Sequence, residues 1–179
     1  MILTIQNIPL RFTSMPTPLG TLVVACSPQG LSEIKILPPH TAFTPPAHWV
    51  PDAGGLAGET VTQLNAFFNG GLRKFSLPLA PRGTLFQIKL WQALERIPYG
   101  TTETYSQVAH RLGLPRGARA VGGGCGANPL PIVVPCHRVV ALKGLGGYTG
   151  GLEIKQKLLA LEQGENRLSN QLLADGNRR

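Results

Sequence analysis

The chain has 179 residues, 42% of them hydrophobic, which is enough for one compact core or two small ones. No apolar run approaches the roughly 18 residues of a membrane span, and the N-terminus lacks the pattern of an export signal. Three cysteines, Cys26, Cys125 and Cys136, cannot all pair within the chain. Free thiols favour a reducing, cytoplasmic compartment and argue against a fold held together by disulfides.

The formal net charge is +8, and it is concentrated in the middle of the chain. Residues 81–151 hold eight basic and two acidic side chains. A region this basic suits a polyanionic partner, most commonly nucleic acid. The alternative is that the charge only keeps the protein in solution.

The first 80 residues predict a small α/β domain. Two β-rich runs are separated by Ser-Pro-Gln-Gly, which is typical of a hairpin. A Pro- and Gly-rich loop follows, then a helix with apolar residues at helical spacing. The predicted elements are strands at Thr21–Cys26 and Leu31–Leu37, a loop at 38–58, a helix at Glu59–Asn69 and a third strand at Phe75–Leu79. Breakers at 79–83 mark a domain boundary.

The second half predicts helices. Thr84 with Gln87, and Thr104 with Gln107, match the capping box that begins a helix. They predict helices at 85–96 and from Thr104 to Gly113. A turn at 114–117 and a second short helix at 118–124 would complete a helix-turn-helix.

Three consecutive glycines, 122–124, oppose that last helix. Each costs about 1 kcal/mol relative to alanine in a helix interior, so propensity alone favours a loop. The alternative is that side chains are missing so that a backbone can approach a partner closely. Propensity does not choose between the two.

The segment 128–140 carries the clearest chemical signal. An apolar run, Ile132 to Val134, lies between Pro131 and Pro135, so Cys136 would sit on stiff backbone at the edge of a core. A cysteine beside a base or cation is a strong nucleophile. A Cys-His pair alone is more often structural.

This segment resembles the active-site signature of the O6-alkylguanine-DNA alkyltransferases. The resemblance lies in PCHRVV, preceded by NPLPIVV and followed by GYTGG, and it extends to TYSQVA, ARAVGG and KQKLLALE. It implies an α/β (α+β) fold, in which a ribonuclease H-like sheet-and-helix domain over 1–80 precedes a mostly helical, winged helix-turn-helix-like domain over 81–163. Residues 164–179 would be a flexible tail.

The resemblance also implies catalytic roles. Cys136 would attack the alkyl carbon on guanine O6 and keep the group as a thioether. His137 would withdraw the thiol proton through a bound water, and Glu162 would orient His137. Asn128 would hold the turn that presents Cys136, and Tyr105 would donate a hydrogen bond to the departing base.

Substrate and DNA contacts follow from the same resemblance. The pocket would be lined by Tyr148, Thr149, Gly150, Val139 and Cys125. Arg119 would fill the place of the extruded nucleotide, and the second motif helix would lie in the minor groove, with Gly122 to Gly124 allowing close approach. The DNA-contacting set would be Arg119, Tyr105, Ser106, Arg116, Gly122 and Gly123.

No cofactor or metal is expected. Cys26 matches one zinc ligand of some relatives, but no histidine stands at the matching places. The implied partner is double-stranded DNA containing O6-alkylguanine, with no membrane and a monomeric protein; cooperative binding along DNA stays open. Two alternatives remain, a DNA-binding regulator with a structural Cys136 and a Cys-His hydrolase, and the product of the reaction would distinguish them.

Overall fold

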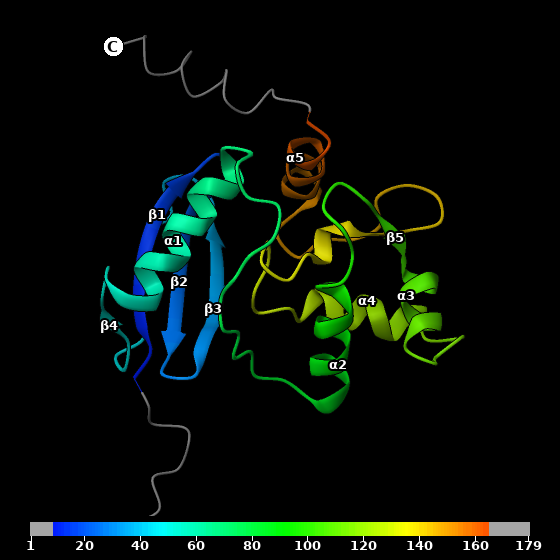
Figure 1. Cartoon of the computed structure of the whole chain (residues 1–179), viewed down its shortest axis with the longest axis horizontal. Helices are drawn as coiled ribbons and strands as arrows, with labels where there is room; N and C mark the ends of the chain where they lie inside the picture. The colour runs from blue at the N-terminus through cyan, green and yellow to red at the C-terminus, as the bar shows by residue number, and fades with distance from the viewer. Residues whose placement is uncertain (1–8, 165–179) are drawn as a thin grey trace, which may run out of the picture. The chain divides into compact units, whose positions relative to one another are not determined.

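A computed structural model describes residues 9–164, which form parts of two compact units that meet in sequence between Pro81 and Arg82 (Figure 1). We call the part up to Pro81 unit 1 and the part from Arg82 unit 2. The predicted flexible tail lies outside the described residues beyond Gly164. Across residues 9–164, no helix is long and apolar enough to cross a membrane.

Unit 1 is a four-stranded sheet with one helix against it. The sheet order is β3-β2-β1-β4, with β1 to β3 antiparallel and β4 parallel to β1. The helix α1 lies across one face of the sheet (Figure 1). The elements are β1 Arg11–Thr17, β2 Gly20–Ser27, β3 Gly30–Leu37, β4 Val50–Pro51 and α1 Gly55–Phe68.

Both faces of β2 are covered, which explains its continuous apolar sequence. Val23 and Ala25 pack with Trp49 on one face, while Cys26 on the alternate face contacts Thr60 of α1. The two predicted strands and their hairpin are confirmed.

Two expectations for unit 1 were wrong, and one strand had not been predicted. That strand, β1, contains Pro16 and is stabilised by its pairing with β2. The helix begins at Gly55 rather than Glu59. Phe75–Leu79 is not a strand: Leu79 makes only a bridge to Leu31, where Gly30, at φ 153°, lets the chains approach.

Unit 2 is built mainly from helices. It contains α2 Leu85–Leu94, β5 Glu103–Thr104, α3 Tyr105–Arg111, α4 Ala118–Gly126, the 3₁₀ turn η2 Cys136–Arg138, β6 Val139–Val140 and α5 Leu152–Glu162. β5 and β6 pair in parallel. Both predicted capping boxes are present, at Thr84 and Thr104. The first predicted helix ends at Leu94, two residues early.

The glycine-rich segment is helical, so the loop alternative for 118–124 is wrong. Gly124 lies against α2: a Cβ there would come within 2.3 Å of Leu90 Cδ2, and the Trp91 indole donates to the Gly124 carbonyl over 3.0 Å. The missing side chain therefore serves helix-helix packing at Gly124, not approach to a partner. Tertiary contacts outweigh the propensity cost.

Candidate active site

The segment before Cys136 is buried and conformationally constrained. Ile132 has φ 77°, which is unusual for a β-branched residue and costs on the order of 1–3 kcal/mol. The strain is sustained by buried neighbours and by the Val134 amide, which donates to the Leu130 carbonyl over 2.8 Å. Cys136 begins η2 with only 6% of its surface exposed. The thiol is thus held on a rigid support, as the sequence predicted.

Asn128 fixes the turn and contacts the sulfur directly. Its Nδ2 donates to the Val134 carbonyl at 2.8 Å and to Cys136 Sγ at 3.1 Å, while its Oδ1 accepts from the Leu130 amide at 3.0 Å. Burial raises the pKa of the Cys136 thiol, and the hydrogen bond from Asn128 and the charge of Lys155 oppose that rise. Asn128 therefore both supports the turn and stabilises the thiolate form.

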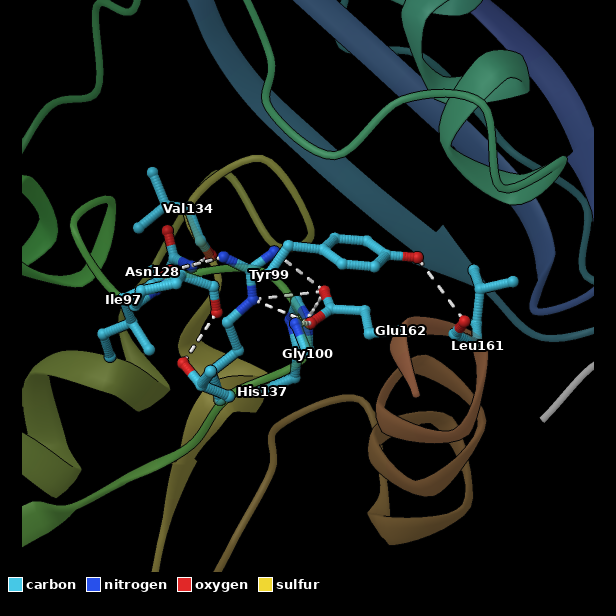
Figure 2. Close-up of polar contacts among 11 residues, drawn as sticks. Ile97, Tyr99, Gly100, Asn128, Val134, His137, Leu161 and Glu162 are labelled. Atoms are coloured by element: carbon cyan, nitrogen blue, oxygen red, sulfur yellow. Dashed lines mark hydrogen bonds and ion pairs between the residues drawn. The ribbon is translucent and has the colours of Figure 1, made fainter. Parts of the chain in front are cut away.

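His137 and Glu162 form a buried pair (Figure 2). His137 Nε2 lies 2.7 Å from Glu162 Oε1, and Arg138 Nε and Nη2 donate to the same carboxylate at 2.9–3.2 Å. The Gly100 amide adds a 3.0 Å hydrogen bond. Burial opposes ionisation of Glu162, but hydrogen bonds from His137 and Arg138 lower its pKa to about 2. Arg138 is thus engaged with Glu162 rather than with the thiol.

The ionised carboxylate fixes the tautomer of His137. Because Glu162 can only accept, Nε2 carries the hydrogen and Nδ1 keeps its lone pair. Burial lowers the pKa of His137 against the opposing effect of Glu162, so the ring is neutral at pH 7. Nδ1 is buried and has no hydrogen-bond partner among residues 9–164. It is a base with a free lone pair.

Aromatic side chains lie beside the thiol. Tyr105 donates to the Gly147 carbonyl at 3.3 Å, and burial together with the Cys125 and Cys136 thiols raises its pKa. The Tyr148 hydroxyl is buried near the Cys136 sulfur, which contributes to raising the Tyr148 pKa, yet it meets no described atom in hydrogen-bonding geometry. Both phenols are protonated at neutral pH and can donate.

The other expected pocket residues surround these groups. Cys125, half-buried in α4, has its pKa raised to about 12 by burial and by Cys136. Thr149 Oγ1 donates to the Gly126 carbonyl at 3.0 Å, which ties the loop to the end of α4. Gly150 packs beside Tyr148, where a Cβ would come within 3.0 Å of the ring. The Val139 carbonyl accepts a hydrogen bond from Lys155 at 2.6 Å.

Lys155 was missed by the sequence analysis. It is fully buried in α5, and its spacing with Leu158 and Glu162 places it on the buried stripe of that helix. A lysine on an apolar helical stripe was therefore the signal that could have identified it.

Apart from Tyr105, which lies beside the thiol, the residues expected to contact DNA lie on α3, on α4 or in the turn between them. Arg116, Arg119 and Ser106 are exposed. A Cβ on Gly123 would meet nothing within 4 Å, and one on Gly122 would touch only the Tyr105 ring. These two glycines leave the surface of α4 open, unlike Gly124.

Within residues 9–164, no group of three or more His, Cys, Asp or Glu side chains is placed to hold a metal ion. Cys26 is buried against α1.

A buried thiol supported by Asn128, beside a His–Glu pair and next to a helix-turn-helix, defines a DNA-binding protein with a cysteine poised for chemistry. Residues 85–164 match the family described as 6-O-methylguanine DNA methyltransferase, DNA binding domain, and residues 10–81 match its ribonuclease-like domain. The chain belongs to the 6-O-methylguanine DNA methyltransferase family. The resemblance and fold class expected from the sequence are confirmed.

Relatives match over most of their length. The methylated-DNA–protein-cysteine methyltransferase of Mycobacterium tuberculosis is 43% identical over 156 residues, covering 86% of this chain and 93% of that protein. The Methanosarcina barkeri protein of the same name is 42% identical over 155 residues, covering 86% and 98%. The crystal structure of M. tuberculosis OGT in complex with DNA is similar, with a TM-score of 0.78 and 42% identity over 86% of this chain and 93% of that one.

Proposed function

We propose that this protein repairs double-stranded DNA by moving the alkyl group of O6-alkylguanine onto Cys136 in one irreversible turnover. The observation that carries the proposal is the arrangement of Cys136, Asn128, His137 and Glu162 in a chain of this family. The names of the relatives, methylated-DNA–protein-cysteine methyltransferase, support the same reaction.

The proton of the thiol has a defined destination. His137 Nδ1 is a free base, held in that tautomer by Glu162. A bridging water would carry the proton from Cys136 Sγ to Nδ1, which leaves a thiolate that Asn128 stabilises.

The transfer itself is a displacement at the alkyl carbon. The thiolate sulfur forms the new C–S bond as the bond from carbon to O6 breaks, and the electron pair stays with guanine. The guanine anion is a poor leaving group unless it receives a proton or a hydrogen bond. Tyr105, protonated and near Cys136, would donate it. A thioether is stable, so the protein would act once.

The base would reach the thiol by leaving the duplex. Extruding a nucleotide costs a few kcal/mol, and Arg119, exposed on α4, would fill the vacated place. Gly122 and Gly123 leave α4 open for a minor-groove approach, and Ser106 and Arg116 would contact the backbone. Tyr148, Thr149, Gly150, Val139 and Cys125 would line the pocket.

We expect a cytoplasmic monomer that needs no cofactor or metal, with domains at 1–80 and 81–163. The three cysteines are all free, as a reducing compartment requires.

The test is mass spectrometry after incubation with a duplex carrying one O6-methylguanine. We expect a gain of one methyl group on Cys136, saturating at one equivalent, and no gain in Cys136→Ser. An unchanged mass with lesion binding would support the non-catalytic regulator instead. Released, hydrolysed substrate would support the hydrolase.

A further inference from the structure

Lys155 is a buried cation that the proposed reaction does not use. Its side chain is fully buried in α5, and no carboxylate among residues 9–164 forms an ion pair with it. A buried charge is costly unless it is paired or fully hydrogen-bonded. Its retention at this position therefore needs a compensating interaction.

Three carbonyls supply part of that compensation. Lys155 Nζ donates to Val139 at 2.6 Å, Leu145 at 2.5 Å and Gly147 at 3.1 Å. An ammonium has three N–H groups and each has an acceptor here, whereas a neutral amine would have only two donors. The hydrogen bonds therefore fit the charged form, although burial lowers the pKa of Lys155.

The same contacts fix one wall of the candidate pocket. Val139, Leu145 and Gly147 span the segment that leads from η2 to Tyr148, and Gly147 also accepts from Tyr105. One ammonium thus joins β6, this segment and α5, and it lies 5.9 Å from the centre of the Tyr105 ring.

The charges near Cys136 leave Lys155 without a formal anion. With His137 neutral, the charges of Glu162 and Arg138 cancel within their own network. The other titratable groups that face Lys155 or the Cys136 thiol are Cys125 of α4, Tyr105 of α3 and Tyr148, and each is neutral when protonated. The thiolate of Cys136 is the anion that would balance Lys155.

We propose that Lys155 is a positioning residue for alkyl transfer, which stabilises the Cys136 thiolate through its charge and holds the 139–147 carbonyls in place. The proposal rests on Cys136 being the nucleophile of the proposed function. Lys155 is then the permanent cation near the thiol, while His137 and Glu162 serve proton transfer.

The test uses iodoacetamide, which alkylates a thiolate with loss of iodide and needs neither DNA nor base binding. The rate at Cys136 is followed by peptide mass spectrometry from pH 5 to pH 10 in the wild type, Lys155→Met, Lys155→Arg and Lys157→Met. Lys157 is the matched control, because it lies on the same helix in an ion pair with Glu153 at 2.7 Å.

We expect Lys155→Met to raise the pH midpoint of the Cys136 reaction by about one unit, so that the rate at pH 7 falls about tenfold. Lys155→Arg keeps the charge and should restore a midpoint nearer that of the wild type, and Lys157→Met should leave it unchanged. A folded Lys155→Met with the wild-type midpoint would overturn the proposal, even if its unfolding temperature falls, because that pattern marks a purely structural lysine.

The wild type gives a second test if Lys155→Met does not fold. Cys26 is equally buried, and the charge that acts on its thiol is the negative charge of Asp52 rather than a cation, so the rate at Cys136 must level off at a lower pH than the rate at Cys26 in the same molecule. A Cys136 rate that rises with pH in parallel with the Cys26 rate up to pH 10 would overturn the proposal. Failure of methyl transfer from O6-methylguanine would instead count against the proposed function, because the iodoacetamide reaction does not depend on it.

Discussion

Cys26 in unit 1 and Cys136 in unit 2 are buried to nearly the same extent, 4% and 6% exposed, yet their surroundings differ in kind. Cys26 has its pKa raised to about 11 by burial, against a hydrogen bond with Thr60, and the negative charge of Asp52 adds to the rise. Cys136 has an amide donor on its sulfur, an ammonium nearby and an adjacent histidine. Burial alone makes a cysteine inert, and the groups around it decide whether it can react.

The backbone differs as well. Cys26 lies within β2, at a shift in its register with β3, and its side chain contacts Thr60 of α1. Cys136 follows a strained turn that is held by Asn128. Strain of this kind persists only where the surroundings enforce it, and it is frequent at functional sites.

The largest expected effect separates the two thiols directly. Cys136→Ala should abolish methyl transfer while binding to duplex DNA persists, because the helix-turn-helix is unchanged. Cys26→Ala should retain one equivalent of transfer. Both are measured by methyl counting on an O6-methylguanine duplex, with binding followed by fluorescence anisotropy. Methyl transfer by Cys136→Ala would show that a residue other than Cys136 is the nucleophile.

Next, Glu162→Gln should slow transfer and also destabilise the protein. It leaves Arg138 buried without its anion, which typically costs about 3–5 kcal/mol. Thermal unfolding at pH 7 and single-turnover rates measure the two losses. An unchanged rate would exclude the orienting role of Glu162.

The same residue predicts a pH dependence of stability. The pKa of Glu162 falls from 4.5 to about 2 on folding, so its stabilisation is complete above about pH 4.5 and is lost as pH falls toward 2. The wild type should therefore lose on the order of 3 kcal/mol more than Glu162→Gln across that window. Denaturant unfolding at several pH values measures the free energy of unfolding of both proteins. The same pH dependence in the wild type and Glu162→Gln would contradict the prediction.

Asn128→Ala tests the support of the Cys136 turn. It removes the donor to Cys136 Sγ and leaves the Leu130 amide without its acceptor, while the Val134 carbonyl keeps only the Cys136 amide as a donor. A hydrogen bond to a charged group is worth about 1.5–3 kcal/mol, so we expect the rate of iodoacetamide reaction at Cys136 to fall about tenfold or more. The rate at Cys26 in the same sample is the internal control and should not change.

Arg119→Ala should have the smallest effect on the thiol itself. Arg119 is exposed on α4, so the iodoacetamide rate at Cys136 should equal that of the wild type. Transfer from duplex DNA should slow about tenfold, since the extruded nucleotide loses its replacement in the stack. Equal rates of methyl transfer by the wild type and Arg119→Ala on duplex DNA would contradict this role.

Sequence patterns were most reliable where local chemistry decides the structure. The capping boxes at Thr84 and Thr104 begin helices as predicted, because two backbone amides are satisfied by side chains three residues apart. The hairpin at Ser27–Gly30 followed from turn residues, and the constrained Cys136 from its flanking prolines.

Sequence patterns failed where contacts between residues distant in the sequence decide the structure. β1 contains Pro16 and forms through pairing with β2. Gly124 was interpreted as room for a partner, but Leu90 of α2 takes that space. Lys155 lies in the KQKLLALE match, yet nothing in its local sequence reveals three carbonyl acceptors from the 139–147 segment.

The sequence by itself determined the family, the helix-turn-helix and the identity of the candidate nucleophile, since these depend on contiguous motifs. Only the tertiary structure decided the charge state around Cys136. It brings Glu162 onto His137 and Arg138, and it brings Lys155 toward the thiol. These interactions join residues 19 to 25 positions apart, and their strength depends on burial, which arises only when α5 packs against η2.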